Sequence, residues 1–132
     1  KLAISLHAAT DELRSKLVPI NKRYPLAELI AACHEYLAIV RRRITFEWVL
    51  IRGINDTPAQ AKELINLVGG MLCHVNVIPL NQTQNYDGAP TTIEMARNFV
   101  NLVDEANISS TIRMPRGNDI KAACGQLRSR AI

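Results

Sequence analysis

The residues best suited to chemistry lie near the end of the chain, around a cysteine. Cys124 stands between the small residues Ala123 and Gly125, which would let a large group approach its sulfur. Arg113 and Arg116 precede it, and guanidinium groups bind phosphate or carboxylate through paired hydrogen bonds. A free cysteine is nevertheless more often buried and structural than reactive. Composition alone leaves both interpretations of Cys124 open.

Two further polar sites follow predicted strands. Ser5, Leu6 and His7 end the first strand, where a hydroxyl and an imidazole could hold a polar ligand. Asn81 follows the third strand, and its carboxamide can both donate and accept hydrogen bonds. In parallel α/β folds, ligand sites gather beyond the carboxyl ends of the strands. The alternatives are that Ser5 and His7 form a satisfied loop and that Asn81 caps a turn.

The elements that must position these residues follow a repeated strand-helix order. Pro25 and Pro58 are placed to open helices, and Thr91 with Glu94 forms a capping-box pattern at a third. The second strand is apolar on both faces, as in a buried parallel sheet. We expect strands at 2–7, 44–51, 73–79 and 109–114, and helices from 11, 25, 58, 91 and 120.

Four strand-helix units predict an α/β fold with a parallel sheet and right-handed crossovers. Four units are half of an eight-unit barrel, and they could also form a small open sheet. Among the remaining residues, Cys33, Cys73 and Trp48 are expected in the core. A Cys-His metal pair at Cys73 and His74 would need further ligands. The run 41–43 of three arginines is expected to be a solvated helix end that could also touch RNA phosphates.

The bulk composition narrows the class of protein. The chain has 132 residues and a net charge of +4, which permits a phosphate-rich partner without requiring one. Three widely spaced cysteines argue against a disulfide framework and fit a reducing cytoplasm. No stretch reaches the roughly 18 apolar residues of a membrane span. Because Lys1 leads directly into a predicted strand, we expect the chain to be a segment of a longer protein.

Several motifs, in order along the chain, resemble those of the RlmN/Cfr family of radical S-adenosylmethionine (SAM) RNA methyltransferases. They span nearly the whole sequence, and the last of them is the most specific. The matching stretches are Ser5-Leu6-His7-Ala8, Asp11-Glu12-x-Arg14, Val18-Pro19-Ile20-Asn21, Ile44-Thr45-Phe46-Glu47, Gly53-Ile54-Asn55-Asp56, Val75-Asn76-Val77-Ile78-Pro79-Leu80-Asn81 and Arg113-x-x-Arg116-Gly117-x-Asp119-Ile120-x-Ala122-Ala123-Cys124-Gly125-Gln126-Leu127.

The resemblance implies a function as well as a fold. It implies a partial (β/α) barrel that holds SAM and a [4Fe-4S] cluster, with residues from about 115 forming a C-terminal tail. Ser5, Leu6, His7 and Asn81 match positions that contact SAM, and Cys124 matches the cysteine that carries the methyl group. Arg113 and Arg116 are candidate RNA phosphate ligands. The implied reaction methylates an adenine of ribosomal RNA, and of tRNA in RlmN enzymes, with an electron donor for the cluster. We favour C2 as the target, as in RlmN, over C8, as in Cfr.

The sequence also departs from the family pattern. It has no C-x-x-x-C-x-x-C motif for the cluster and no second cysteine placed to resolve a protein–RNA adduct. In the family these lie upstream, with the first barrel strands and a small RNA-binding domain. We therefore expect these 132 residues to be inactive alone and to self-associate through an unpaired edge of the first strand. The alternatives are a non-catalytic RNA-binding domain and an unrelated α/β binding protein with Cys124 in its core.

Overall fold

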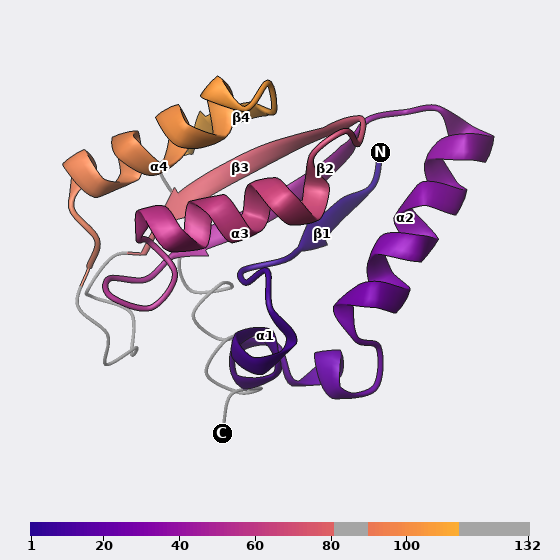
Figure 1. Cartoon of the computed structure of the whole chain (residues 1–132), viewed down its shortest axis with the longest axis horizontal. Coiled ribbons are helices and arrows are strands. Elements are labelled where there is room, and N and C mark those ends of the chain that lie inside the picture. The colour runs from indigo at the N-terminus through magenta and orange to yellow at the C-terminus, as the bar shows by residue number, and fades with distance from the viewer. Residues whose placement is uncertain (81–89, 114–132) are drawn as a thin grey trace.

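The chain forms a parallel four-stranded sheet with strand order β1-β2-β3-β4 (Figure 1). The computed structural model describes residues 1–80 and 90–113. The strands are β1 (Ala3–Ser5), β2 (Ile44–Leu50), β3 (Cys73–Pro79) and β4 (Ser109–Ile112). The helices are α1 (Asp11–Leu17), the short 3₁₀ helix η1 (Pro19–Lys22), α2 (Leu26–Val40), α3 (Pro58–Val68) and α4 (Ile93–Glu105). The α/β class and the parallel sheet are confirmed.

Several predicted boundaries differ from the structure. β1 begins at Ala3 rather than at residue 2, β2 ends at Leu50 rather than at residue 51, and Pro25 is the N-cap of α2, which begins at Leu26. The first strand ends at Ser5 rather than at residue 7, because the backbone of His7 turns into the left-handed region. The fourth strand ends at Ile112 rather than at residue 114. The predicted capping box at Thr91 is wrong by one residue. Thr92 caps α4 by accepting from the Met95 N–H (3.1 Å), whereas the Thr91 hydroxyl donates to a neighbouring loop. The predicted helix from residue 120 lies outside the described residues.

One face of the sheet is apolar and covered by helices. Alternate residues of β2, from Ile44 to Leu50, point to this face and are fully buried. They form one core cluster with residues of α2, α3 and α4, among them Cys33 and Phe99. Figure 1 shows α3 and α4 lying side by side in front of the strands. The Trp48 ring lies 5.6 Å from that of Phe99. Trp48 and Cys33 are both buried, which confirms them as core residues.

The opposite face is polar over much of its length. The register of the parallel pairs brings side chains of β1 to β4 together there, namely Ser5, Thr45, Glu47, His74, Asn76, Ser109 and Thr111. Near the carboxyl ends of the strands the face becomes apolar. There Val49 and Ile78 join a second cluster with Leu17 of α1. Both faces of β2 are thus largely buried, as the sequence predicts.

None of the helices within residues 1–80 and 90–113 combines the length and the apolar character needed to cross a membrane.

Candidate functional site

A tight turn follows β1 at the carboxyl edge of the sheet. The Leu6 N–H donates to the Glu47 carbonyl (2.9 Å) and so continues the pairing with β2. The Ala8 N–H then donates back to the Leu6 carbonyl (2.7 Å), across a single residue. That residue, His7, has a φ of +60°, which is uncommon outside glycine and costs about 1 kcal/mol or more. Such a backbone persists only where its surroundings hold it.

The imidazole of His7 is fixed in one tautomer. Its Nδ1 atom accepts from the Val49 N–H (3.0 Å), so the proton of the neutral ring resides on Nε2. Burial and, to a smaller extent, the positive charge of Arg14 lower the pKa of His7 to about 4. His7 is therefore neutral at pH 7. No partner for the Nε2–H group lies among the described residues, so this N–H is available to donate to a bound ligand.

A buried guanidinium holds the backbone beneath this turn. Arg14 of α1 is only 5% exposed. Its Nε donates to the Leu6 carbonyl and one terminal nitrogen to the Ser5 carbonyl, both at 3.0 Å. Its other terminal nitrogen donates to Asn21 Oδ1, also at 3.0 Å. The fork of Arg14 thus fixes both peptide oxygens that precede His7.

Asn21 and Asp11 complete this network. The Asn21 amide donates to Asp11 Oδ1 and to Ser15 Oγ, each at 3.0 Å. Asp11 Oδ1 also accepts the backbone N–H of Leu26 at the start of α2 (2.9 Å). The hydrogen bond from Leu26 and then that from Asn21 lower the pKa of Asp11. The Asp11 carboxylate is therefore linked to the Arg14 guanidinium indirectly, through the side chain of Asn21.

Asn55 holds the other side of the turn. Its carboxamide is fully buried and donates to the His7 and Val49 carbonyls, both at 2.8 Å. Its Oδ1 accepts the Ile51 N–H at 2.7 Å. Asp56, the next residue, accepts the Gly53 N–H through one carboxylate oxygen and the Thr91 hydroxyl through the other. The loop after β2 is thereby attached both to the His7 turn and to the segment before α4.

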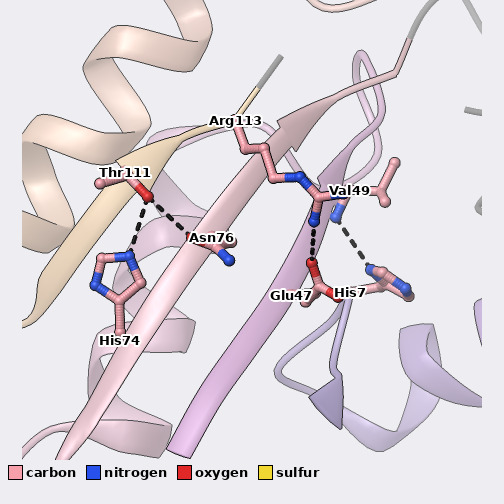
Figure 2. A network of polar contacts seen from close by, with 7 residues as sticks. All are labelled: His7, Glu47, Val49, His74, Asn76, Thr111 and Arg113. Carbon is pink, nitrogen blue, oxygen red and sulfur yellow. Dashed lines mark hydrogen bonds and ion pairs between the residues drawn. The ribbon is translucent and has the colours of Figure 1, made fainter. Parts of the chain in front are cut away.

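An ion pair and a hydrogen-bond chain cross the polar face (Figure 2). Arg113, directly after β4, reaches over β3 to Glu47 on β2, with 3.0 Å between nitrogen and oxygen. The Thr111 hydroxyl donates its proton to Asn76 Oδ1 (2.9 Å). The oxygen of this hydroxyl must therefore accept its second hydrogen bond, which comes from the Nε2–H of His74 at 3.0 Å. The candidate phosphate ligand Arg113 is therefore already paired with a carboxylate.

His74 and Cys73 lie on opposite faces of β3. Burial, followed by the charge of Arg43, lowers the pKa of His74. Cys73 lies on the opposite, apolar face, and burial raises the pKa of its thiol to about 11. No group of three or more His, Cys, Asp or Glu residues within the described ranges could hold a metal ion. Cys73 is confirmed as structural, and the three arginines from Arg41 are exposed at the end of α2.

Sequence reasoning located part of the site and missed its supports. It placed Ser5, Leu6 and His7 together at a strand end, where the structure has them. It gave no role to Arg14 or Asn55, although both lie within the quoted motifs. No sequence signal marks either residue, because both bind backbone groups that only the fold brings close to them. Asn81, Arg116 and Cys124 lie outside the residues that the structure describes.

Comparison with known proteins relates the chain to RNA methyltransferases. It is 50% identical over 129 residues to "Dual-specificity RNA methyltransferase RlmN" of Gluconobacter oxydans, with 97% of this chain and 32% of that protein covered. It is 53% identical over 130 residues to a probable RlmN of Moorella thermoacetica, with 97% of this chain and 36% of that protein covered. Over nearly its whole length, the chain is therefore similar to about a third of each of these RlmN proteins. No family model matches it.

Two solved structures share the fold of this chain. A radical SAM methyltransferase from Sphaerobacter thermophilus is 53% identical, with a TM-score of 0.88 over 98% of this chain and 38% of that protein. A domain of pyruvate-formate lyase-activating enzyme from Bacteroides vulgatus shares the fold at 12% identity, with a TM-score of 0.68 over 85% of this chain and 66% of that one. The chain spans about a third of the length of the curated RlmN relatives it matches.

The residues present fit SAM but not an iron–sulfur cluster. A neutral imidazole with an available Nε2–H, beside a serine at the strand end, suits a ligand rich in polar atoms. Cluster iron is held by cysteine thiolates, which this chain does not supply in a suitable arrangement. Its two described cysteines are buried on the helix-covered side of the sheet, and the sequence has no C-x-x-x-C-x-x-C motif.

Proposed function

We propose that this chain forms one wall of the SAM site, and carries the methyl-bearing cysteine, of a radical SAM RNA methyltransferase of the RlmN type. The observation that supports it is the fixed Ser5–His7 turn, which presents a neutral histidine N–H at the carboxyl edge of the sheet. Identity of about 50% to proteins named RlmN gives the turn its chemical context. All 132 residues then belong to the barrel domain, with the tail from about 115 containing Cys124.

Each residue of the proposed site has a distinct task. His7 donates its Nε2–H to a polar atom of SAM, and its neutrality avoids placing a second positive charge near the sulfonium. Ser5, Leu6 and Asn81 complete the contacts to SAM. The Cys124 sulfur accepts a methyl group and presents it to the base. Bound SAM supplies the methyl group and the radical chemistry. The cluster is held by residues outside this chain.

The proposed substrate is C2 of an adenine in large-subunit ribosomal RNA and in tRNA, methylated in the cytoplasm with electrons from a reductase. The names of the similar proteins favour an RlmN-type methyltransferase over a C8 methyltransferase and over a non-catalytic RNA-binding domain. An exposed cationic run from Arg41 to Arg43 and a net charge of +4 suit a polyanionic partner.

The test uses the full-length protein with its cluster reconstituted. SAM labelled in its methyl group should label the protein and then the RNA, and mass spectrometry should identify 2-methyladenosine. Cys124→Ala should abolish both labels while SAM binding persists. Cys33→Ala, which removes a cysteine from the core, is the matched control and should retain RNA methylation. Methylation by Cys124→Ala, or a wild-type protein that methylates nothing, would overturn the proposal, and 8-methyladenosine would overturn its C2 assignment.

A further inference from the structure

The placement of Arg14 calls for an explanation beyond fold stability. A buried ion is weak evidence for stability, because an apolar residue of similar volume usually serves as well. Arg14 is 5% exposed, and none of its described hydrogen bonds goes to a carboxylate. Two of the three go to the consecutive carbonyls of Ser5 and Leu6. The side chain therefore acts on the backbone of the ligand-binding turn itself.

The Leu6 carbonyl is the point at which Arg14 acts. This oxygen accepts from Arg14 Nε at 3.0 Å and from the Ala8 N–H at 2.7 Å. The second of these bonds closes the turn that forces His7 to a φ of +60°. The Ser5 carbonyl, held by the same guanidinium, fixes the preceding peptide plane. The rigid, planar fork suits two adjacent carbonyls, whereas a lysine ammonium cannot keep all three bonds in this geometry.

We propose that Arg14 is a positioning residue for SAM binding. Together with Asn21 and Asp11, it holds the His7 turn in its left-handed conformation, with Nδ1 on the Val49 N–H and Nε2–H directed to the ligand. This inference rests on the proposed function, since SAM is the ligand of the turn. Without the Arg14 fork, the His7 backbone relaxes toward negative φ and its imidazole loses the fixed tautomer.

Asn21 allows the positioning role to be separated from direct contact. Its side chain bonds to Arg14, Asp11 and Ser15, and no described hydrogen bond joins it to the turn. Among the described hydrogen bonds, Arg14 is the link between Asn21 and the turn, so we expect the effect of Asn21→Ala on SAM binding to pass through Arg14. The two substitutions should be non-additive, because each disrupts the same network.

The experiment measures binding of SAM, without turnover, to the full-length protein by calorimetry. We expect Arg14→Lys to weaken SAM binding about ten-fold or more, a loss typical of outer-shell partners. Asn21→Ala should weaken it several-fold, and the double variant should bind no more weakly than Arg14→Lys. Val103→Ala, in the core on the helix-covered face, is the control for lost stability and should leave the affinity unchanged.

A second readout needs no ligand. Imidazole ¹⁵N shifts of His7 in the free protein should report the Nε2–H tautomer in the wild type and in Val103→Ala. In Arg14→Lys and Asn21→Ala they should show mixed tautomers. Unchanged affinity and unchanged His7 shifts in these variants would overturn the positioning role, as would an equal loss of affinity in Val103→Ala. If Arg14→Lys does not fold, Asn21→Ala decides. A wild type that binds no SAM would instead overturn the proposed function, and the His7 shifts would still test the network.

Discussion

Acidification should destabilise the protein through His7. Protonation of the ring at Nδ1 breaks the hydrogen bond that this atom accepts from the Val49 N–H. It also places a positive charge on a side chain that is only 4% exposed and lies near the Arg14 guanidinium. The folded-state pKa of about 4 lies below the ordinary 6.5. The stabilisation is therefore complete above pH 6.5 and is lost as the pH falls toward 4. This difference in pKa corresponds to about 3 kcal/mol.

The assay is urea unfolding of the 132-residue chain at several pH values between 7 and 4. His7→Asn is the matched variant, because asparagine tolerates a left-handed backbone and does not titrate. The free energy of unfolding of the wild type should fall by up to about 1.4 kcal/mol for each pH unit in this window. His74, whose pKa burial also lowers, contributes equally to both proteins. The same pH dependence in both, or a His7 NMR titration midpoint near 6.5, would refute the reasoning.

Three further substitutions test other parts of the structure. Asn55→Ala leaves three buried backbone groups without partners and should cost about 3 kcal/mol by urea unfolding; a loss below 1 kcal/mol would mean that water replaces them. Gln60→Met replaces a buried Oε1 that has no hydrogen-bond partner among the described residues, and it should raise the free energy of unfolding by about 1 kcal/mol; a decrease would show that the oxygen is satisfied. The backbone groups of Leu2 and Leu6 bond to β2, and successive residues of a strand point their backbone groups to opposite sides, so the Ala3 N–H points away from β2. Ala3→Pro removes this N–H from the outer edge of β1 and should reduce self-association, measured by light scattering at rising protein concentration. A wild-type monomer at every concentration would contradict this.

Much of the fold could be predicted because local signals and packing agree. Prolines mark the starts of α2 and α3, and the β-branched run of β2 leaves little choice of element. The errors occur where a tertiary contact overrides the local pattern. Thr91 satisfies the capping pattern, yet its hydroxyl bonds to Asp56, 35 residues away, and the helix is capped one residue later. β1 ends early because the network around His7 reverses the backbone.

The site was predicted only in part, for a related reason. Sequence reasoning finds side chains that can meet a ligand, so Ser5 and His7 were visible at their strand end. Arg14 and Asn55 bind backbone carbonyls and N–H groups, and a sequence carries no pattern that identifies such partners. The pairing of Arg113 with Glu47 spans 66 residues and depends on the register of three strands. Only the assembled sheet reveals it.

Glu47 shows how residues far apart in the sequence are brought to one place. Its backbone carbonyl accepts the Leu6 N–H at the His7 turn, while its carboxylate pairs with Arg113 at the end of β4. One residue of β2 therefore joins the proposed SAM-binding turn to the start of the segment that leads to Cys124. An exposed ion pair of this kind contributes at most about 1 kcal/mol of stability. Its greater consequence is geometric, because it ties Arg113, directly after β4, to the residue of β2 that also bonds to the His7 turn. Residues more than 100 positions apart in the sequence thus meet at Glu47.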